Sequence, residues 1–382
     1  MAARKQPLHS LTGLRFVAAL AVSLLHLTDV GLDPAWMAGM QPYFETLCNG
    51  VTFFFVLSGF ILAYNYLDEM RAPTAPALRR FYAARWARVY PVYFLVLAFA
   101  MTTLPLAALW EYRRIWFLWT TTTNFTLTQA FLPDPLMHFG FYGVAWSLSV
   151  EAFFYLCFPV IAWIISRWVR PGWEWPIAIA LCAVSIGYHG LVQGRPWTGW
   201  ACYVFPLARL PDFLVGMLLG RAYLRRGSHP NAARRAAVSA ELLAAASIAA
   251  LAICSPALPL TLRVCAAATP GLAFAVWTFA CGGGPLARLA ATAPAVYLGE
   301  ISYSYYLLHP LTIKAWKSVR SAFGGDEWHA AVQMAAVCVA TVAASSACYY
   351  LWEMPARRWC LRMLSPSRAD VRVAPSALRR AA

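Results

Sequence analysis

Long apolar runs recur along the chain, and short polar or charged segments separate each run from the next. About 20 consecutive apolar residues suffice for a helix to cross a bilayer, and helices satisfy their own backbone hydrogen bonds there. The pattern predicts an all-α fold, a polytopic transmembrane helical bundle of about ten spans. The segment 109–142 could hold a re-entrant or short extra helix. The expected spans lie near residues 12–30, 50–67, 88–108, 143–166, 176–191, 203–222, 239–254, 264–281, 295–313 and 330–352.

Composition supports a membrane protein. Of the 382 residues, 61% are hydrophobic and only 12% are charged, against about 25% charged in soluble domains. The first thirty residues superficially resemble a signal peptide, but Arg15 and His26 interrupt the apolar run and no small-residue cleavage site follows Leu27. We therefore expect the first helix to be retained as a membrane span.

The net charge of +15 bears on topology rather than on nucleic acid. Most arginines and lysines fall in alternate loops and in the carboxy-terminal tail, so the positive-inside rule predicts cytoplasmic termini. We expect membrane lipids and no nucleic acid as partners.

Residues 1–355 are expected to form the transmembrane domain, and residues 356–382 a basic, disordered cytoplasmic tail. The absence of a visible internal repeat weakens a transporter reading based on inverted halves.

Cysteine usage predicts no metal site and no disulfide framework. The ten cysteines show no CxxC pair and no regular spacing. Most lie in apolar runs, where a thiol behaves as a small hydrophobic group. The chemistry must therefore come from other polar residues.

Two ionisable residues, Arg15 and His26, interrupt the first expected span. Charged or titratable groups at membrane depth are costly, so they are functional candidates by default. Their separation of eleven residues corresponds to about three helical turns, or roughly 16 Å along the axis. Both side chains therefore share one face of the helix, with Arg15 near the cytoplasmic surface and His26 deeper.

Arg85 and Arg88 precede the third expected span and are neighbours on a helix because they are three residues apart. The guanidinium fork binds phosphate oxygens in a bidentate manner, so the pair could clamp a diphosphate. The alternative is positive-inside charge or contact with lipid head groups.

The small pair Ser58-Gly59 interrupts an aromatic run in the second expected span. Small residues allow a neighbouring helix to approach closely. Helix packing is the simpler interpretation, and a ligand contact is the alternative.

The span expected at 143–166 opens with Trp146 and Ser147 and carries Glu151. These residues suggest a polar pocket on the outer side of the membrane. A lone carboxylate at this depth is either neutral or paired. His26 and Arg209 are the candidate partners of opposite character, and a purely structural role for Glu151 is the alternative.

Two further spans carry polar groups. Arg209 and Asp212 are three residues apart and could simply pair with each other. The span at 295–313 holds too many hydroxyl groups for a lipid-facing helix, so we expect them to line a polar interior. His309 follows near its outer end, where an interfacial histidine has an ordinary explanation. The hydroxyl-bearing residues are Ser302, Tyr303, Ser304, Tyr305 and Tyr306.

Six segments in order together resemble the acyltransferase-3 family of bacterial integral membrane O-acyltransferases, over about residues 10–355. Each segment alone is a weak signal, whereas their shared order is specific. The matching segments are Gly13-Leu14-Arg15 through His26, Phe54 to Phe60, Arg85 to Pro91, Trp146 to Glu151, Arg209 to Gly216, and Gly299 to Ser304 ending at His309.

The resemblance implies transfer of an acyl group, usually acetyl, from acyl-CoA to a hydroxyl group, in the bacterial cytoplasmic (inner) membrane. Acceptors in the family are typically sugars of surface polysaccharides or their lipid-linked precursors, with macrolides and other secondary metabolites as further cases. The family's essential first-helix residues match Arg15 and His26. Its Arg-x-x-Arg segment, associated with coenzyme A, matches Arg85 and Arg88. Glu300 stands where many relatives carry a basic or small polar residue.

The residues suit this chemistry. Histidine is the usual general base because its pKa lies near working pH, so we expect His26 to activate the acceptor hydroxyl. Glu151 could orient its imidazole, as a carboxylate does in a triad. Arg15, Arg85 and Arg88 would hold the anionic coenzyme A moiety at the cytoplasmic mouth.

A covalent acyl-histidine or acyl-serine relay is a second mechanism, and a non-enzymatic transporter of a glycan or lipid-linked substrate is the rival from another class. We expect acyl-CoA as a co-substrate and a carbohydrate or glycolipid acceptor, and the oligomeric state is left open. Tyr303 or Ser304 could hydrogen-bond the thioester oxygen or the acceptor. The candidate substrate-binding residues are Trp146, Ser147, Tyr303, Ser304, Arg209 and His309.

Overall fold

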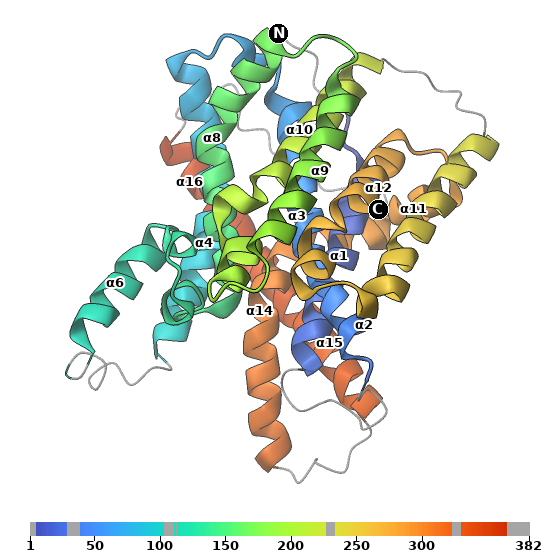
Figure 1. The fold of residues 1–382 in the computed structure, drawn as a ribbon. Helices are drawn as coiled ribbons and strands as arrows, with labels where there is room; N and C mark the ends of the chain where they lie inside the picture. The colour runs from blue at the N-terminus through green and yellow to red at the C-terminus, as the bar shows by residue number, and fades with distance from the viewer. Residues whose placement is uncertain are drawn as a thin grey trace. The chain divides into compact units, whose positions relative to one another are not determined.

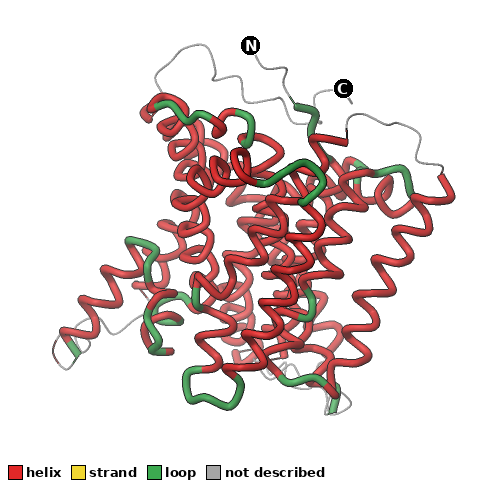
Figure 2. The backbone as a smooth tube through the Cα atoms, turned by 45° about the horizontal axis from the view of Figure 1, so that its top comes forward, coloured by secondary structure: helices red, strands yellow, loops and turns green. Residues whose placement is uncertain are grey.

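The regular structure of the chain is helical. The computed structural model describes residues 5–28, 39–102, 111, 113–226, 234–322 and 330–364. Within these ranges there are helices and loops but no β-strand (Figure 2). The predicted all-α class is therefore confirmed.

The chain forms two compact units. The first comprises the described residues within Met1–Phe54, Gly227–Ala257 and Phe274–Ala382. In this unit α1 packs along α14, and α14 packs along α15. Its helices, labelled in Figure 1 where there is room, are α1 (His9–Thr28), α2 (Gln41–Glu45), η2 (Thr46–Cys48), α11 (Arg234–Cys254), η7 (Ser255–Ala257), α13 (Pro285–Ala290), α14 (Ala293–Ala322), α15 (Ala330–Cys348), η10 (Tyr349–Glu353) and α16 (Met354–Leu364).

The second unit comprises the described residues within Phe55–Arg226 and Leu258–Ala273. In this unit α10 packs against α9 and α8. Two helices, α3 (Asn49–Tyr66) and α12 (Thr269–Cys281), continue from one unit into the other. The remaining helices are η3 (Glu69–Arg71), α4 (Ala75–Thr102), α6 (Arg114–Phe125), η4 (Gln129–Phe131), α7 (Pro135–His138), η5 (Gly143–Ala145), α8 (Trp146–Trp168), α9 (Glu174–Val192), η6 (Trp200–Val204), α10 (Pro206–Arg226) and η8 (Leu262–Ala266).

Eight helical segments in the described ranges are long and apolar enough to cross a membrane. Each coincides with an expected span, and the other two expected spans fall on α4 and α14. The short helix α6 lies in the segment 109–142, and α16 includes the first residues of the expected tail, whereas residues 365–382 lie outside the described ranges. The count of ten spans and the cytoplasmic termini stay predictions. The eight segments are His9–Thr28, Gln41–Tyr66, Gly143–Trp168, Glu174–Val192, Trp200–Arg226, Arg235–Ala257, Leu262–Cys281 and Ala330–Leu364.

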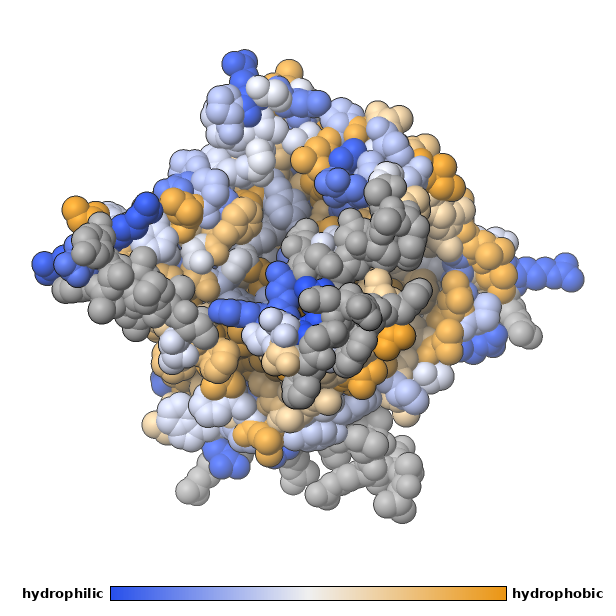
Figure 3. All heavy atoms as spheres, turned by 90° about the horizontal axis from the view of Figure 1, so that it is seen from below, coloured by the Kyte–Doolittle hydropathy of each residue, from blue (hydrophilic) through white to orange (hydrophobic). Residues whose placement is uncertain are grey.

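Large apolar side chains are exposed on several of these helices. Leu191 on α9 is 82% exposed and Val339 on α15 is 70% exposed. Apolar residues, orange in Figure 3, also reach the surface on the face drawn there. Extensive exposed apolar surface is unfavourable in water, so it fits helices that contact lipid chains.

Glycines set the closest helix contacts in the first unit. A Cβ atom added at Gly299 of α14 would lie 1.8 Å from the carbonyl oxygen of Thr12 on α1. One added at Gly13 of α1 would lie 2.0 Å from the carbonyl oxygen of Ala290 on α13. Only a residue without a side chain fits such an approach. The Gly299 contact holds α1 against α14, the two helices that carry the histidines described below, and the Gly13 contact holds α1 against α13.

The second unit repeats this packing between α3 and α10. A Cβ atom at Gly59 would lie 2.0 Å from the carbonyl oxygen of Phe213, and one at Gly216 would lie 1.9 Å from that of Val56. Gly216 and Gly220 form a GxxxG pair, a known pattern for close helix contacts in membranes. The helix-packing interpretation of Ser58-Gly59 is therefore confirmed.

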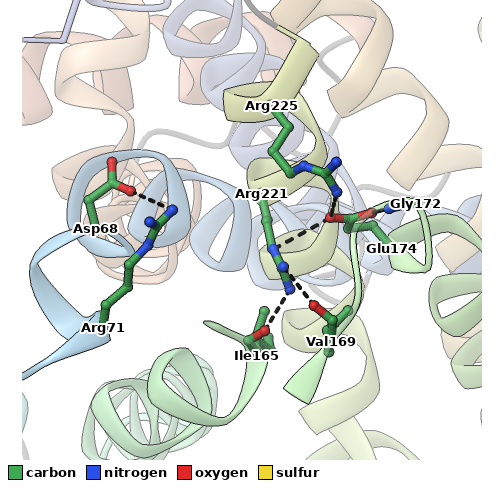
Figure 4. A network of polar contacts seen from close by, with 8 residues as sticks. All are labelled: Asp68, Arg71, Ile165, Val169, Gly172, Glu174, Arg221 and Arg225. Atoms are coloured by element: carbon green, nitrogen blue, oxygen red, sulfur yellow. Dashed lines mark hydrogen bonds and ion pairs between the residues drawn. The ribbon is translucent and has the colours of Figure 1, made fainter. Parts of the chain in front are cut away.

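Arginines of α10 fix one end of α8 in the second unit (Figure 4). Arg221 donates to the carbonyl oxygens of Ile165 and Val169, at 2.6 and 2.7 Å. The last carbonyl groups of a helix have no partner within the helix, so these bonds cap α8. Glu174 at the start of α9 pairs with both Arg221 and Arg225. Arg221 and Arg225 thus connect α10 to both α8 and α9.

Candidate active site

Two histidines meet where α1 packs along α14. His309 Nε2 lies 3.3 Å from His26 Nδ1, and the two ring centroids are 5.1 Å apart. His309 is completely buried, whereas His26 is only partly buried. His26 is therefore the member of the pair that a substrate can reach. The structure joins two residues that the sequence placed on separate spans with separate roles.

The neutral form of His26 has a defined basic atom. Its Nδ1 lies 2.8 Å from the carbonyl oxygen of Val22, one turn earlier on α1. A carbonyl oxygen only accepts hydrogen bonds, so Nδ1 carries the proton and donates it. The lone pair then resides on Nε2, which is the atom that can accept a proton from a substrate hydroxyl.

The hydroxyl groups of α14 are buried, as the sequence predicted. Ser302, Ser304 and Tyr305 have no exposed surface, and Tyr306 is 6% exposed. The Tyr305 hydroxyl donates to Ser23 Oγ of α1 at 3.4 Å. These side chains line a polar interior between helices of the first unit. Tyr303 is only partly buried, and its role toward the substrate stays a prediction.

Glu353, a residue that the sequence analysis missed, is the partner of Ser304. The Ser304 hydroxyl donates to Glu353 Oε2 at 2.6 Å, and the carboxylate is 2% exposed. Glu353 ends η10, a π-helical turn of a kind that often marks functional sites. The signal available in the sequence was a lone carboxylate at the end of the last expected span. The predicted contact of Ser304 with substrate remains untested.

Arg85 lies in an aromatic setting in the second unit. Its guanidinium group is 5.4 Å from the centroid of the Tyr66 ring and 5.7 Å from that of the Tyr155 ring. Arg85 Nη2 donates to the Tyr66 hydroxyl at 3.3 Å, while Nε is buried and meets no hydrogen-bond acceptor in the described part of the chain. Cation–π contacts hold such a group in place and leave donors for an anion. Arg88 follows one turn later on α4, as expected.

Glu151 on α8 connects to this arginine through Tyr155. The Tyr155 hydroxyl donates to Glu151 Oε1, and the Ser58 hydroxyl lies 3.5 Å from the same oxygen. Within the second unit, Glu151 therefore contacts the hydroxyl groups of Tyr155 and Ser58, and Arg85 lies against the Tyr155 ring. The predicted contact of Glu151 with His26 stays a prediction. Tyr66 and Tyr155 were not singled out from the sequence because tyrosines near membrane interfaces are common.

Trp146 and Ser147 begin α8 and are buried. The Trp146 ring packs 4.6 Å from the Tyr203 ring, and the Ser147 hydroxyl donates to the carbonyl oxygen of Val144 at 3.0 Å. Both residues are placed by packing and by local hydrogen bonding. Their predicted contact with substrate stays a prediction.

Arg209 and Asp212 form a buried ion pair on α10. Arg209 Nη2 lies 3.1 Å from Asp212 Oδ2, and the two side chains are 1% and 4% exposed. Thr269 donates to the other carboxylate oxygen at 2.6 Å. The prediction that these two residues pair with each other is therefore confirmed. Substrate binding by Arg209 stays a prediction.

Arg15 lies on α1, the same continuous helix as His26, and is partly buried. One continuous helix thus carries both residues, and their shared face and depths stay predictions. No group of three or more His, Cys, Asp or Glu side chains in the described ranges is arranged to hold a metal ion.

Comparison with known proteins assigns these features to a class. Residues 8–350 match the profile of the acyltransferase-3 family, described as an acyltransferase domain. The acyltransferase MdmB of Streptomyces mycarofaciens is 28% identical over 330 residues, which cover 80% of this chain and 79% of MdmB. No solved structure matches the chain.

Two further relatives align over smaller shares. The peptidoglycan O-acetyltransferase OatA of Listeria monocytogenes is 26% identical over 42% of this chain and 25% of OatA. The O-acetyltransferase OatA of Staphylococcus aureus is 25% identical over 56% of this chain and 34% of OatA. The matched part of the chain therefore spans about a quarter to a third of the length of these O-acetyltransferases.

The helices and intramembrane polar groups define a multi-pass membrane protein. Because the family match spans 343 of the 382 residues, counted from 8 to 350, the chain belongs to the acyltransferase-3 family. It is a membrane acyltransferase.

Proposed function

We propose that the protein is an O-acetyltransferase that moves an acetyl group from acetyl-CoA to a sugar hydroxyl of a bacterial surface polysaccharide or its lipid-linked precursor. The observation that carries this proposal is the partly buried His26, whose Nδ1–H is held by the Val22 carbonyl oxygen and whose Nε2 keeps its lone pair. The O-acetyltransferase names of two relatives support acetyl transfer to oxygen.

The proposed reaction begins with the acceptor hydroxyl next to His26 Nε2. The imidazole takes the hydroxyl proton while the oxygen attacks the thioester carbonyl carbon. The tetrahedral intermediate collapses, the C–S bond breaks, and the coenzyme A thiolate leaves. His26 then returns the proton to the thiolate, so the products are an ester and free thiol, and the histidine ends neutral.

The donor is held by arginines in this proposal. The Arg85 guanidinium is fixed by the rings of Tyr66 and Tyr155 and has a buried Nε donor to offer. Phosphate oxygens are strong acceptors for such a group. Arg88 and Arg15 keep their predicted roles in binding the acyl-CoA phosphates. The enzyme would work in the bacterial inner membrane, with the arginine-rich loops in the cytoplasm.

Assay of the purified full-length chain in lipid nanodiscs tests the proposal. Acetyl-CoA is supplied with one of three acceptors: polysaccharide fragments, lipid-linked oligosaccharides or a macrolide. Free thiol and the mass of the acceptor are both measured. Acetylation of a glycan with equal release of thiol is the expected result. Acetylation of the macrolide alone would favour the alternative of secondary-metabolite tailoring. Transport of a glycan without thiol release would overturn the proposal.

A further inference from the structure

The protons on the two histidine rings follow from their carbonyl neighbours. His26 Nδ1 lies 2.8 Å from Val22 O, and His309 Nδ1 lies 2.7 Å from Tyr306 O. Each Nδ1 must donate, because carbonyl oxygens accept. His309 Nε2, which is 3.3 Å from His26 Nδ1, therefore accepts. A proton on it would place two donors against each other.

Pro310 removes the usual backbone donor to the Tyr306 carbonyl oxygen. In a regular helix this oxygen would accept from the backbone N–H of residue 310. Residue 310 is Pro310, inside α14, and proline has no N–H to donate. The vacated acceptor is taken by the His309 ring one turn along the same helix. The Nδ1 atoms of His26 and His189 also contact carbonyl oxygens one turn earlier without a following proline, so Pro310 removes a competing backbone donor rather than creating the acceptor.

The two rings differ in what they can still do. His309 has no exposed surface, and both of its nitrogens have partners, at Tyr306 O and His26 Nδ1. His26 is partly buried, and its two acceptors share the single Nδ1 proton. An acceptor beside Nδ1–H favours the tautomer with the lone pair on Nε2 and stabilises the imidazolium that forms when Nε2 takes a proton.

We propose that His309 is a positioning residue for His26: as a neutral tautomer whose Nδ1–H donates to Tyr306 O, it accepts from His26 Nδ1–H and directs the basic lone pair of His26 to Nε2. In a triad this role belongs to a carboxylate, whereas a neutral imidazole adds no charge to the apolar interior. The inference rests on the proposed function, because it assumes that His26 is the base, and it replaces the ordinary interfacial reading of His309.

Another buried histidine provides a matched control. His189 on α9 is 1% exposed, and its ring nitrogens lie near the carbonyl oxygens of Ser185 and Cys202, at 2.7 and 3.3 Å. Its recorded hydrogen-bond partners are thus backbone atoms rather than a second imidazole. Its replacement measures the general cost of removing a buried histidine from this protein.

The tautomers of His26 and His309 can be measured by NMR without an activity assay. The full chain, labelled with ¹⁵N-histidine and reconstituted in lipid, is studied by solid-state NMR, and the signals are assigned with His26→Ala and His309→Leu. We expect protonated Nδ1 and unprotonated Nε2 for both residues in the wild type. In His309→Leu only Val22 O remains to accept from His26 Nδ1, so the preference weakens and we expect the Nε2–H tautomer to appear beside the Nδ1–H form. A single unchanged Nδ1–H tautomer of His26 in that variant would overturn the inference.

Turnover per folded protein provides the second readout. His309→Leu should lose about a hundredfold, a typical size for general-base assistance. His309→Gln, whose side-chain oxygen can accept from His26 Nδ1–H, should stay within about tenfold of the wild type. The His189→Gln control should change turnover by less than about twofold, well below the general-base effect. Equal loss in the Leu and Gln variants of His309 would contradict a role in accepting that bond.

Pro310→Ala keeps the test decisive where His309→Leu does not fold. The new backbone N–H shares Tyr306 O with the His309 ring, so the His309 Nδ1–H bond should weaken and its NMR signal should shift. An unchanged His309 signal in this variant would contradict the role of Pro310. A wild-type protein that transfers no acyl group but shows the expected tautomers would refute the proposed function and leave the histidine geometry intact.

Discussion

Two pairs of buried polar residues lie on helices that cross at glycines, and they differ in how they are compensated. In the first unit, His26 and His309 meet where α1 packs along α14. In the second, Arg209 and Asp212 form an ion pair on α10, which packs tightly against α3. The ion pair neutralises itself and is almost fully buried. The histidine pair carries no fixed charge, and one ring remains partly accessible.

The difference separates a structural polar pair from a chemical one. A buried ion pair whose charges cancel is a poor binding site for a charged substrate, and its main effect is the penalty for breaking it. The histidine pair leaves one nitrogen lone pair uncommitted, which a general base requires. Both satisfy the rule that intramembrane polar residues are costly, but only one of them points to catalysis.

Breaking the ion pair should have the largest effect on stability. Asp212→Asn leaves the Arg209 charge uncompensated at a position where both side chains are nearly fully buried. We expect a loss of about 3–5 kcal/mol in the free energy of unfolding. The measurement is chemical unfolding in detergent micelles, followed by the fluorescence of the protein's tryptophans.

The double variant Arg209→Met with Asp212→Leu sharpens this test, because it removes both charges. It should recover most of the lost stability. If the double variant is as stable as the wild type but turns over more slowly, the result would support the predicted role of Arg209 in binding substrate. Unfolding of Asp212→Asn at wild-type denaturant concentrations would refute the structural reading of the pair.

A side chain at the crossing of the first unit should have the next largest effect. Gly299→Ala places a Cβ atom 1.8 Å from the Thr12 carbonyl oxygen, so α1 must move away from α14. We expect a loss of about 1–3 kcal/mol and lower turnover, because His26 moves relative to His309. Thermal unfolding and the acetyl transfer assay measure the two effects.

Gly187→Ala on α9 is the matched control, since a Cβ atom there meets nothing within 4 Å. It should keep wild-type stability and turnover. If Gly187→Ala and Gly299→Ala lose stability and turnover equally, the close contact between α1 and α14 does not determine the position of the histidines.

Removal of the Arg85 charge should have a smaller and more specific effect. Hydrogen bonds to charged groups contribute about 1.5–3 kcal/mol, so Arg85→Gln should raise KM for acetyl-CoA roughly tenfold or more, with kcat less affected. Steady-state thiol release at varied acetyl-CoA concentrations measures both constants.

The control, Arg80→Gln, removes the same charge from a half-exposed side chain that pairs with Glu69 on the same unit. Exposed pairs contribute little, so its KM should stay within about twofold of the wild type. Similar KM values for the two variants would mean that Arg85 contributes only general positive charge.

Much of the fold could be predicted because apolar length and glycine placement act locally. Within the described residues, the runs of apolar residues correctly predicted a helix at each expected span, and Ser58-Gly59 correctly predicted a close helix contact. The pairing of Arg209 with Asp212 was also accessible, since residues three apart on a helix are neighbours.

The contacts that join distant segments could not be predicted in the same way. His26 and His309 are separated by 283 positions, and Ser304 and Glu353 by 49. No local periodicity determines which helices become neighbours or which rotamers the side chains adopt. The effect of Pro310 on the Tyr306 carbonyl oxygen was visible in the sequence, but its consequence required the position of the His309 ring.

Turnover of His26→Ala shows whether the Nε2 lone pair of His26 activates the acceptor. The variant is purified, its folding is checked by thermal unfolding, and acetyl transfer is measured beside the wild type. We predict a folded protein in which transfer is reduced by at least about a hundredfold, the scale of general-base catalysis. Near-normal transfer in the folded His26→Ala protein would contradict the account.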